Sequence, residues 1–141
     1  GPEGPEGMPT GVVHDAAGTG RVEEDIQCLH LCLRAAVGGA ARGLAGKADV
    51  EWVLRRLRSL QIEADDDTWV LAMQVLGNAA QRGHASVADA ERLLDKAEAS
   101  RHKAGRIASA AVHCAFFEAA AAAAQSRKNK YAVDARERLL S

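Results

Sequence analysis

The sequence predicts an all-α protein. Alanine dominates the apolar fraction, aromatic residues make up only 4% of the 141 residues, and all three prolines lie within the first nine positions. Alanine has the highest intrinsic helix propensity and proline the lowest. Alternating strand patterns and β-branched runs are missing, so nothing in the sequence favours a sheet.

Residues 1–20 differ in composition from the rest of the chain. They read GPEGPEGMPTGVVHDAAGTG, which is rich in glycine and holds every proline. Such a segment cannot bury enough apolar area to offset the entropy of ordering it. We therefore predict a flexible N-terminal arm over 1–20 and a helical-repeat domain over 21–141. The opening GPEGPEG is either an added segment ahead of Met8 or the mature end of a processed precursor.

The first two helices are predicted over 22–37 and 48–60. Three consecutive acids from Glu23 suit the positive end of a helix dipole, and apolar residues then recur every three or four positions. The pair Gly38-Gly39 is a plausible stop for the first helix. The second helix carries an apolar stripe of Val and Leu with arginines on its remaining surface.

The next two helices are predicted over 67–82 and 87–100. The acidic run from Asp65 to Asp67 offers several N-caps, and the segment after it is apolar nearly all round, with Trp69 and Met73 as core residues. Gly83 can end this helix. Ser86, followed three residues later by an acid, resembles a capping box that starts the next helix.

Two further helices complete the predicted set of six. A long segment over 107–125 has high helix propensity because of its alanine run, and Asn129 is a candidate N-cap for a final helix over 130–140. A short phrase recurs in every second helix, with aspartates at Asp49, Asp89 and Asp134. This spacing is typical of helical repeats. The expected architecture is an α-solenoid of about three stacked antiparallel helical hairpins.

Residues 60–100 resemble one repeat family in particular. The segment Leu60-Gln61-Ile62-Glu63-Ala64-Asp65 looks like the "G-I-x-P-D" end of a pentatricopeptide-type repeat. The pair Thr68-Trp69, the turn Ala79-Ala80-Gln81-Arg82-Gly83 and the helix Asp89-Ala90-Glu91-Arg92-Leu93-Leu94 are similar to the consensus of that family. The resemblance implies an α-solenoid that binds RNA in mitochondria or plastids, often one base per repeat.

The positions that would read bases in that family are apolar in this chain. The predicted third helix begins with Val70, Leu71 and Ala72, and the fifth offers only Ser109 as a polar candidate. The predicted repeats are also longer than the usual thirty-five or so residues. Tetratricopeptide, octotricopeptide and HEAT-like arrays are therefore open alternatives, and we expect contact with RNA phosphates rather than with base edges.

Basic residues recur near the predicted helix ends, although the whole chain has a net charge of only −1. Stacked hairpins can align such residues into a stripe that contacts phosphates, and ordinary solvated charge is the alternative. The candidates for RNA phosphate contact are Arg55, Arg58, Arg101, Lys103, Arg106, Arg127, Lys128 and Lys130. On the final helix, Tyr131, Leu139 and Leu140 are apolar, so we expect another protein subunit to cover them.

The sulfur and imidazole groups predict neither a metal site nor catalysis. Cys28, His30 and Cys32 match no standard zinc spacing, and we expect both cysteines to pack in the core while His30 points elsewhere. His113 and Cys114 are adjacent, so they face different sides of a helix, with the thiol expected to be buried. We predict no enzyme, metal, cofactor or small-molecule substrate.

The odd, sparse cysteines fit a reducing intracellular compartment, and the family resemblance adds a mitochondrion or plastid. No apolar run reaches the length of a membrane span. The leading hypothesis is a non-catalytic subunit of a larger assembly, an organellar ribonucleoprotein in which the chain contacts RNA phosphates. The alternative is a protein-protein interaction scaffold that does not bind RNA.

Overall fold

The computed structural model describes the backbone of residues 7–141 and the side chains of residues 20–141. Its five helices are α1 (Gly7–Ala41), α2 (Lys47–Ser59), α3 (Asp66–Gln81), α4 (Val87–Lys103) and α5 (Ala110–Leu140). Residues 7–141 contain no strand, which confirms the all-α prediction.

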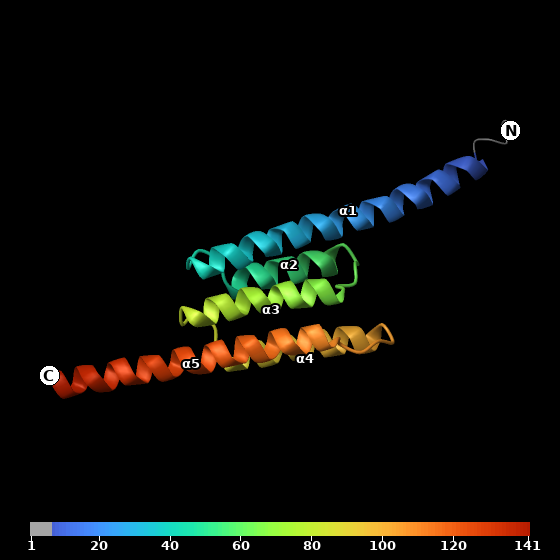
Figure 1. Ribbon diagram of the computed structural model, residues 1–141. Helices are drawn as coiled ribbons and strands as arrows, with labels where there is room; N and C mark the ends of the chain where they lie inside the picture. The colour runs from blue at the N-terminus through green and yellow to red at the C-terminus, as the bar shows by residue number, and fades with distance from the viewer. Residues whose placement is uncertain (1–6) are drawn as a thin grey trace.

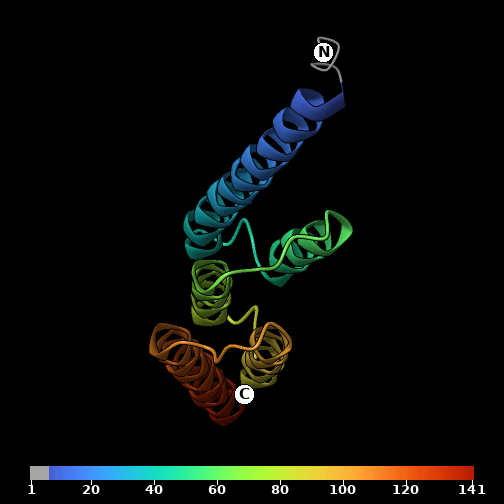
Figure 2. The same ribbon diagram turned by 90° about the vertical axis from the view of Figure 1, so that its right-hand side faces the viewer.

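The helices lie in two layers (Figures 1 and 2). One layer holds α1, α3 and α5, with α3 in the middle, and α2 and α4 form the other layer without contacting each other. The contacts agree with this view, because α3 packs against both α1 and α5, while α2 touches α1 and α3, and α4 touches α3 and α5. Helices consecutive in the sequence run in opposite directions and are joined by short turns.

Helix α1 begins much earlier than the predicted residue 22. It starts at Gly7 and therefore includes most of the segment predicted as a flexible arm, whose first six residues lie outside the described part of the chain. Pro9 stands in the first turn of α1, where a backbone N–H has no intrahelical partner and proline is tolerated. Scattered glycines lower helix propensity by about 1 kcal/mol each but do not forbid helix.

The prediction of six helices is wrong at the C-terminal end. The structure has one continuous helix over Ala110–Leu140, where two were predicted with a break before residue 130. Asn129 lies inside α5, where its side-chain oxygen accepts a hydrogen bond from Gln125 Nε2 at 3.0 Å. Neither glycine nor proline interrupts residues 110–140, so no residue forces the helix to end there.

Four successive helices end in the same way. After α1 the amide of Leu44 donates to the carbonyl of Gly39 at 2.8 Å, and equivalent bonds close α2, α3 and α4. This six-residue bond defines a Schellman motif, which requires one residue with positive φ. Gly43, Gly83 and Gly105 supply it for α1, α3 and α4, whereas Gln61 does so for α2. The predicted end of α3 at Gly83 is confirmed.

Two of the three recurring aspartates have the same role. Asp49 accepts a hydrogen bond from the amide of Gly46 at 2.9 Å, and Asp89 accepts one from the amide of Ser86 at the same distance. Each carboxylate lies in the first turn of a second-layer helix, α2 or α4. Asp134 lies within α5, so the sequence phrase marks the start of a helix only twice.

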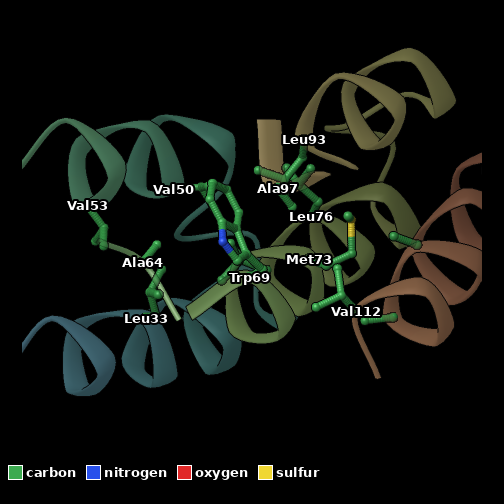
Figure 3. Close-up of a cluster of buried hydrophobic side chains, with 14 of the residues drawn as sticks. Leu33, Val50, Val53, Ala64, Trp69, Met73, Leu76, Leu93, Ala97 and Val112 are labelled. Atoms are coloured by element: carbon green, nitrogen blue, oxygen red, sulfur yellow. The ribbon is translucent and has the colours of Figure 1, made fainter. Parts of the chain in front are cut away.

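The core lies where α3 meets the helices on either side (Figure 3). Trp69 and Met73 of α3 are buried, as predicted, and Figure 3 shows Trp69 between α1, α2 and α4 while Met73 points towards Val112 of α5. Small alanines such as Ala72 and Ala119 are also fully or almost fully buried, which lets the helices approach closely. None of the described helices is both long and apolar enough to cross a bilayer.

Candidate phosphate-binding groove

A groove of about 570 Å³ lies where the start of α4 approaches the middle of α5. Three separate helices bring basic side chains to it, together with the turn between α3 and α4. Its basic lining residues are Lys47 from α2, His84 from the turn, Arg92 from α4, and Arg127 and Lys130 from α5. The groove is therefore locally positive, although the whole chain has a net charge of −1.

Asp89 is the one acidic residue among those that line this groove. The Lys47 ammonium lies 3.4 Å from one carboxylate oxygen, and the Arg92 guanidinium lies 2.5 Å from the other. This carboxylate thus holds two cations from different helices at one place. Four permanent positive charges against one negative charge leave the groove cationic.

The capping box of α4 keeps Asp89 ionised. Burial alone would raise the pKa of Asp89, but hydrogen bonds from Ser86 and the neighbouring Arg92 and Lys47 outweigh burial and lower it. Ser86 Oγ in turn accepts from the amide of Asp89 at 3.1 Å. The first turn of α4 is therefore capped by Ser86 and Asp89 together.

The basic surface continues along α5. Arg127, Lys130, Tyr131 and Asp134 line an adjoining hollow of about 290 Å³, and the Arg127 guanidinium lies 5.8 Å from the centre of the Tyr131 ring. An arginine at this distance from an aromatic face is held by a cation–π interaction. Two predicted phosphate-contact residues, Arg127 and Lys130, are thus brought together with Tyr131, a predicted docking residue.

Arg101 does not belong to this surface. Its side chain is only 7% exposed. Its Nη1 lies 3.2 Å from a Glu63 carboxylate oxygen and 3.4 Å from the Ala64 carbonyl, while its Nε lies 3.3 Å from Asp66, close enough for an ion pair but not aligned as a hydrogen bond. This arginine joins α4 to the start of α3 and is not free to contact a phosphate.

Arg58 and Lys103 line a different hollow. It measures about 580 Å³ and lies between the ends of α2 and α4, with Trp69 among its apolar lining residues. The buried indole N–H of Trp69 has no acceptor among the described side chains and backbone. The remaining candidates, Arg55, Arg106 and Lys128, are exposed on α2, in the turn before α5 and on α5, away from both hollows.

The predicted docking residues are open to solvent. Tyr131 is 61% exposed, Val133 is exposed to a similar extent, and Leu139 and Leu140 are exposed still further. They occupy the half of α5 that projects beyond the other helices (Figure 1). Nothing in the described part of the chain covers them.

The predictions for the three cysteines and for His30 are wrong. Cys28, Cys32 and Cys114 are all exposed, whereas His30 is buried. The buried stripe of α1 runs through Leu29, Leu33, Ala36 and Ala40, and His30 adjoins it because it finds polar partners on α3. No three His, Cys, Asp or Glu side chains in the described residues are placed to hold a metal ion.

Lys47 and Arg92 are the groove residues that sequence reasoning missed. Lys47 lies two residues before Asp49 and Arg92 lies three after Asp89, and these positions alone look like ordinary charge on a helix surface. The recurrence of Asp49 and Asp89 was the available signal, because repeated helix starts lie side by side in a stacked array.

No protein-family model matches the chain, and neither a curated protein nor a solved structure matches it significantly.

Proposed function

We propose that the chain is a non-catalytic helical-repeat module, a short α-solenoid that binds the phosphates of an RNA strand within a larger assembly. The assembly would be a ribonucleoprotein of a mitochondrion or plastid. One observation carries this proposal: Lys47, Arg92, Arg127 and Lys130 converge on a single groove that contains one carboxylate. Lysine and arginine clustered on one face are the electrostatic footprint of a nucleic-acid-binding surface.

The two-layer arrangement supports the solenoid part of the proposal. Helices α1, α3 and α5 stack in one layer, and α2 and α4 pack against that layer from the same side, an arrangement typical of hairpin repeats. The repeated capping aspartates place equivalent turns next to each other, and Lys47 of one unit thereby reaches Asp89 of the next. A groove that spans two units is typical of repeat proteins that bind an extended strand.

The groove predicts backbone contact without base reading. Its cationic residues are lysines and arginines, its lining contains no Trp, Tyr or Phe ring, and Tyr131 lies in the adjoining hollow. Phosphate contacts position a strand but carry no sequence information. We therefore expect similar affinity for single-stranded RNAs of different sequence, with a strong dependence on salt.

The test is a titration of the whole chain with a mixed-sequence single-stranded RNA at several salt concentrations. Four phosphate contacts predict a slope of about −3 for log K against log salt, at about 0.7 per contact. The double variant Arg127→Gln/Lys130→Gln should flatten the slope by about 1.4. The matched control is Arg55→Gln/Arg136→Gln, which removes two exposed arginines outside the groove and should leave the slope unchanged.

Absence of RNA binding at low salt by a folded chain would overturn the proposal, and an equal effect of the control variant would show diffuse charge in place of a site. In the first case the protein-scaffold function takes precedence. The exposed apolar residues at the end of α5, Tyr131, Val133, Leu139 and Leu140, favour that second function. Exposed apolar clusters of this kind mark protein interaction sites.

A further inference from the structure

The outward face of α5 has no neighbour among the residues that the structure describes. Val112, Ala115, Ala119 and Ala123 are buried on the opposite side, where α5 packs on α3. The outward face repeats at alternating steps of three and four residues through Cys114, Phe117, Ala121, Ala124, Lys128 and Tyr131, all of them exposed. We call these six residues the outer seam of α5. A three-four alternation is the spacing at which two helices pack side by side.

We propose that the outer seam of α5 pairs with the same seam of a second copy of the chain, antiparallel, to form a two-fold symmetric dimer. The seam is about 26 Å long at 1.5 Å per residue. Its two largest side chains are poorly covered, since Phe117 is 65% exposed and Tyr131 is 61% exposed. Between them lie Ala121 and Ala124, whose small side chains let two helix axes approach closely.

The seam is complementary to itself in one register. With Ala121 opposite Ala124 of the second copy, Phe117 faces Lys128 and Cys114 faces Tyr131. Two-fold symmetry repeats each contact, so both ends of the seam place a large ring beside a residue that can cover it. The Lys128 stem lies over the Phe117 ring with its ammonium at the rim, an arrangement that a cation–π interaction stabilises.

Charges beside the seam exclude the neighbouring registers. In the proposed register Glu118 faces Gln125 of the second copy. A slip of one heptad in one direction would bring Glu118 opposite Glu118, and a slip in the other would bring Arg127 opposite Arg127. Like charges at these flanking positions disfavour a pairing. The sequence of α5 thus favours one antiparallel alignment over its two nearest competitors.

A further pair joins opposite charges across the two-fold axis. The Ser109 carbonyl, 3.0 Å from Nδ1, and the Glu98 carboxylate, 3.3 Å from Nε2, raise the pKa of His113 and so favour its charged form. In the proposed register Asp134 of the second copy faces this ring. The dimer goes beyond the proposed RNA function. The groove and the seam meet at Arg127 and Tyr131, whereas Lys47 and Arg92 of the groove belong to α2 and α4, so dimerisation can be measured without RNA.

The first test is the solution mass of the whole chain by light scattering across a concentration series. The wild type should approach twice its 14.9 kDa as concentration rises. Ala121→Glu puts two carboxylates at the centre of the seam and should return the mass to that of one chain. The matched control is Ala35→Glu on the exposed side of α1, which should leave the dimer intact. Circular dichroism checks that both variants keep their helix content.

A disulfide reports the register. In a Cys28→Ser/Cys32→Ser background, Tyr131→Cys places a thiol opposite the native Cys114 of the second copy. Within one chain these positions lie about 26 Å apart on one helix, too far for a bond, so a cross-link can only join two chains. Mild oxidation should give a covalent dimer, whereas the background with Cys114 alone should not.

Three results would overturn the proposal. They are a wild-type chain that stays monomeric at the highest concentration, a dimer that survives Ala121→Glu, and a dimer that Ala35→Glu disrupts. The last result would assign the interface to α1. None of these outcomes depends on RNA, so failure of the dimer and failure of the proposed function are distinguishable.

Discussion

His30 lies on α1, but its hydrogen bonds reach the first turn of α3. Its Nε2 lies 2.8 Å from Thr68 Oγ1 and 3.2 Å from an Asp65 carboxylate oxygen. The Thr68 hydroxyl lies 2.7 Å from the same carboxylate oxygen, so its single hydrogen is donated there and it accepts from His30. Asp65 also caps α3 by accepting from the amide of Thr68 at 2.9 Å. One buried imidazole therefore ties two first-layer helices together.

We expect His30→Ala to lower the free energy of unfolding by about 1–3 kcal/mol, because it removes a buried hydrogen bond and leaves Thr68 with an unused acceptor. Urea denaturation followed by circular dichroism measures the change. His84→Ala is the control, since His84 is an exposed histidine in the turn before α4. Equal small effects for the two variants would contradict a structural role for His30.

Residue-level prediction from sequence succeeded for Trp69 and Met73 and failed for the cysteines and for His30. Trp69 and Met73 are buried because removing their large apolar area from water is favourable. Cys28 and Cys32 were expected inside because cysteine behaves as a small hydrophobe. Their actual exposure depends on the exact rotation of α1, which the His30 contact with Thr68 helps to set.

The close approach of α3 and α5 depends on a glycine. A Cβ on Gly77 would lie 3.5 Å from the Cα and 3.6 Å from the Cβ of Ala119. These are ordinary contact distances, so there is room for one methyl group and for little more. The small residues Gly77 and Ala119 thus allow the two helices to lie close together. Larger side chains at either position would separate the helices.

We expect opposite effects from two substitutions at Gly77. Gly77→Ala should raise the free energy of unfolding by about 0.5–1 kcal/mol through better helix propensity, and Gly77→Leu should lower it by about 1–3 kcal/mol through overpacking. Thermal and urea denaturation give both values. At Gly38, where an added Cβ meets nothing within 4 Å, neither change should destabilise the chain. A tolerated Gly77→Leu would show that α5 is not seated closely on α3.

The two long helices extend beyond the layers at opposite ends of the molecule. The first half of α1 projects at one end, and the second half of α5 projects at the other (Figure 1). From Arg127 to Leu140 nearly every residue of α5 is exposed, so this half gains its stability from local helix propensity alone. Packed and unpacked halves of one helix should therefore differ in local stability.

Hydrogen exchange measures that difference. In the Ala121→Glu variant, which removes the proposed pairing, we expect amides of residues 112–123 to exchange at least tenfold more slowly than those of residues 130–140. The first group lies against α3, whereas nearly every residue of the second group is exposed to solvent. Similar protection along the whole of α5 would contradict this, because it would require a contact that covers the second half.

Local sequence signals were sufficient for the helical class, for most helix starts and stops, and for the large core residues of α3. These properties depend on propensity, caps and periodicity, which act over a few neighbouring residues. The burial of His30 and Arg101 and the meeting of Lys47 and Arg92 with Arg127 and Lys130 were decided by tertiary structure. Each depends on how separate helices rotate and stack, and that is set by packing between residues about forty positions apart.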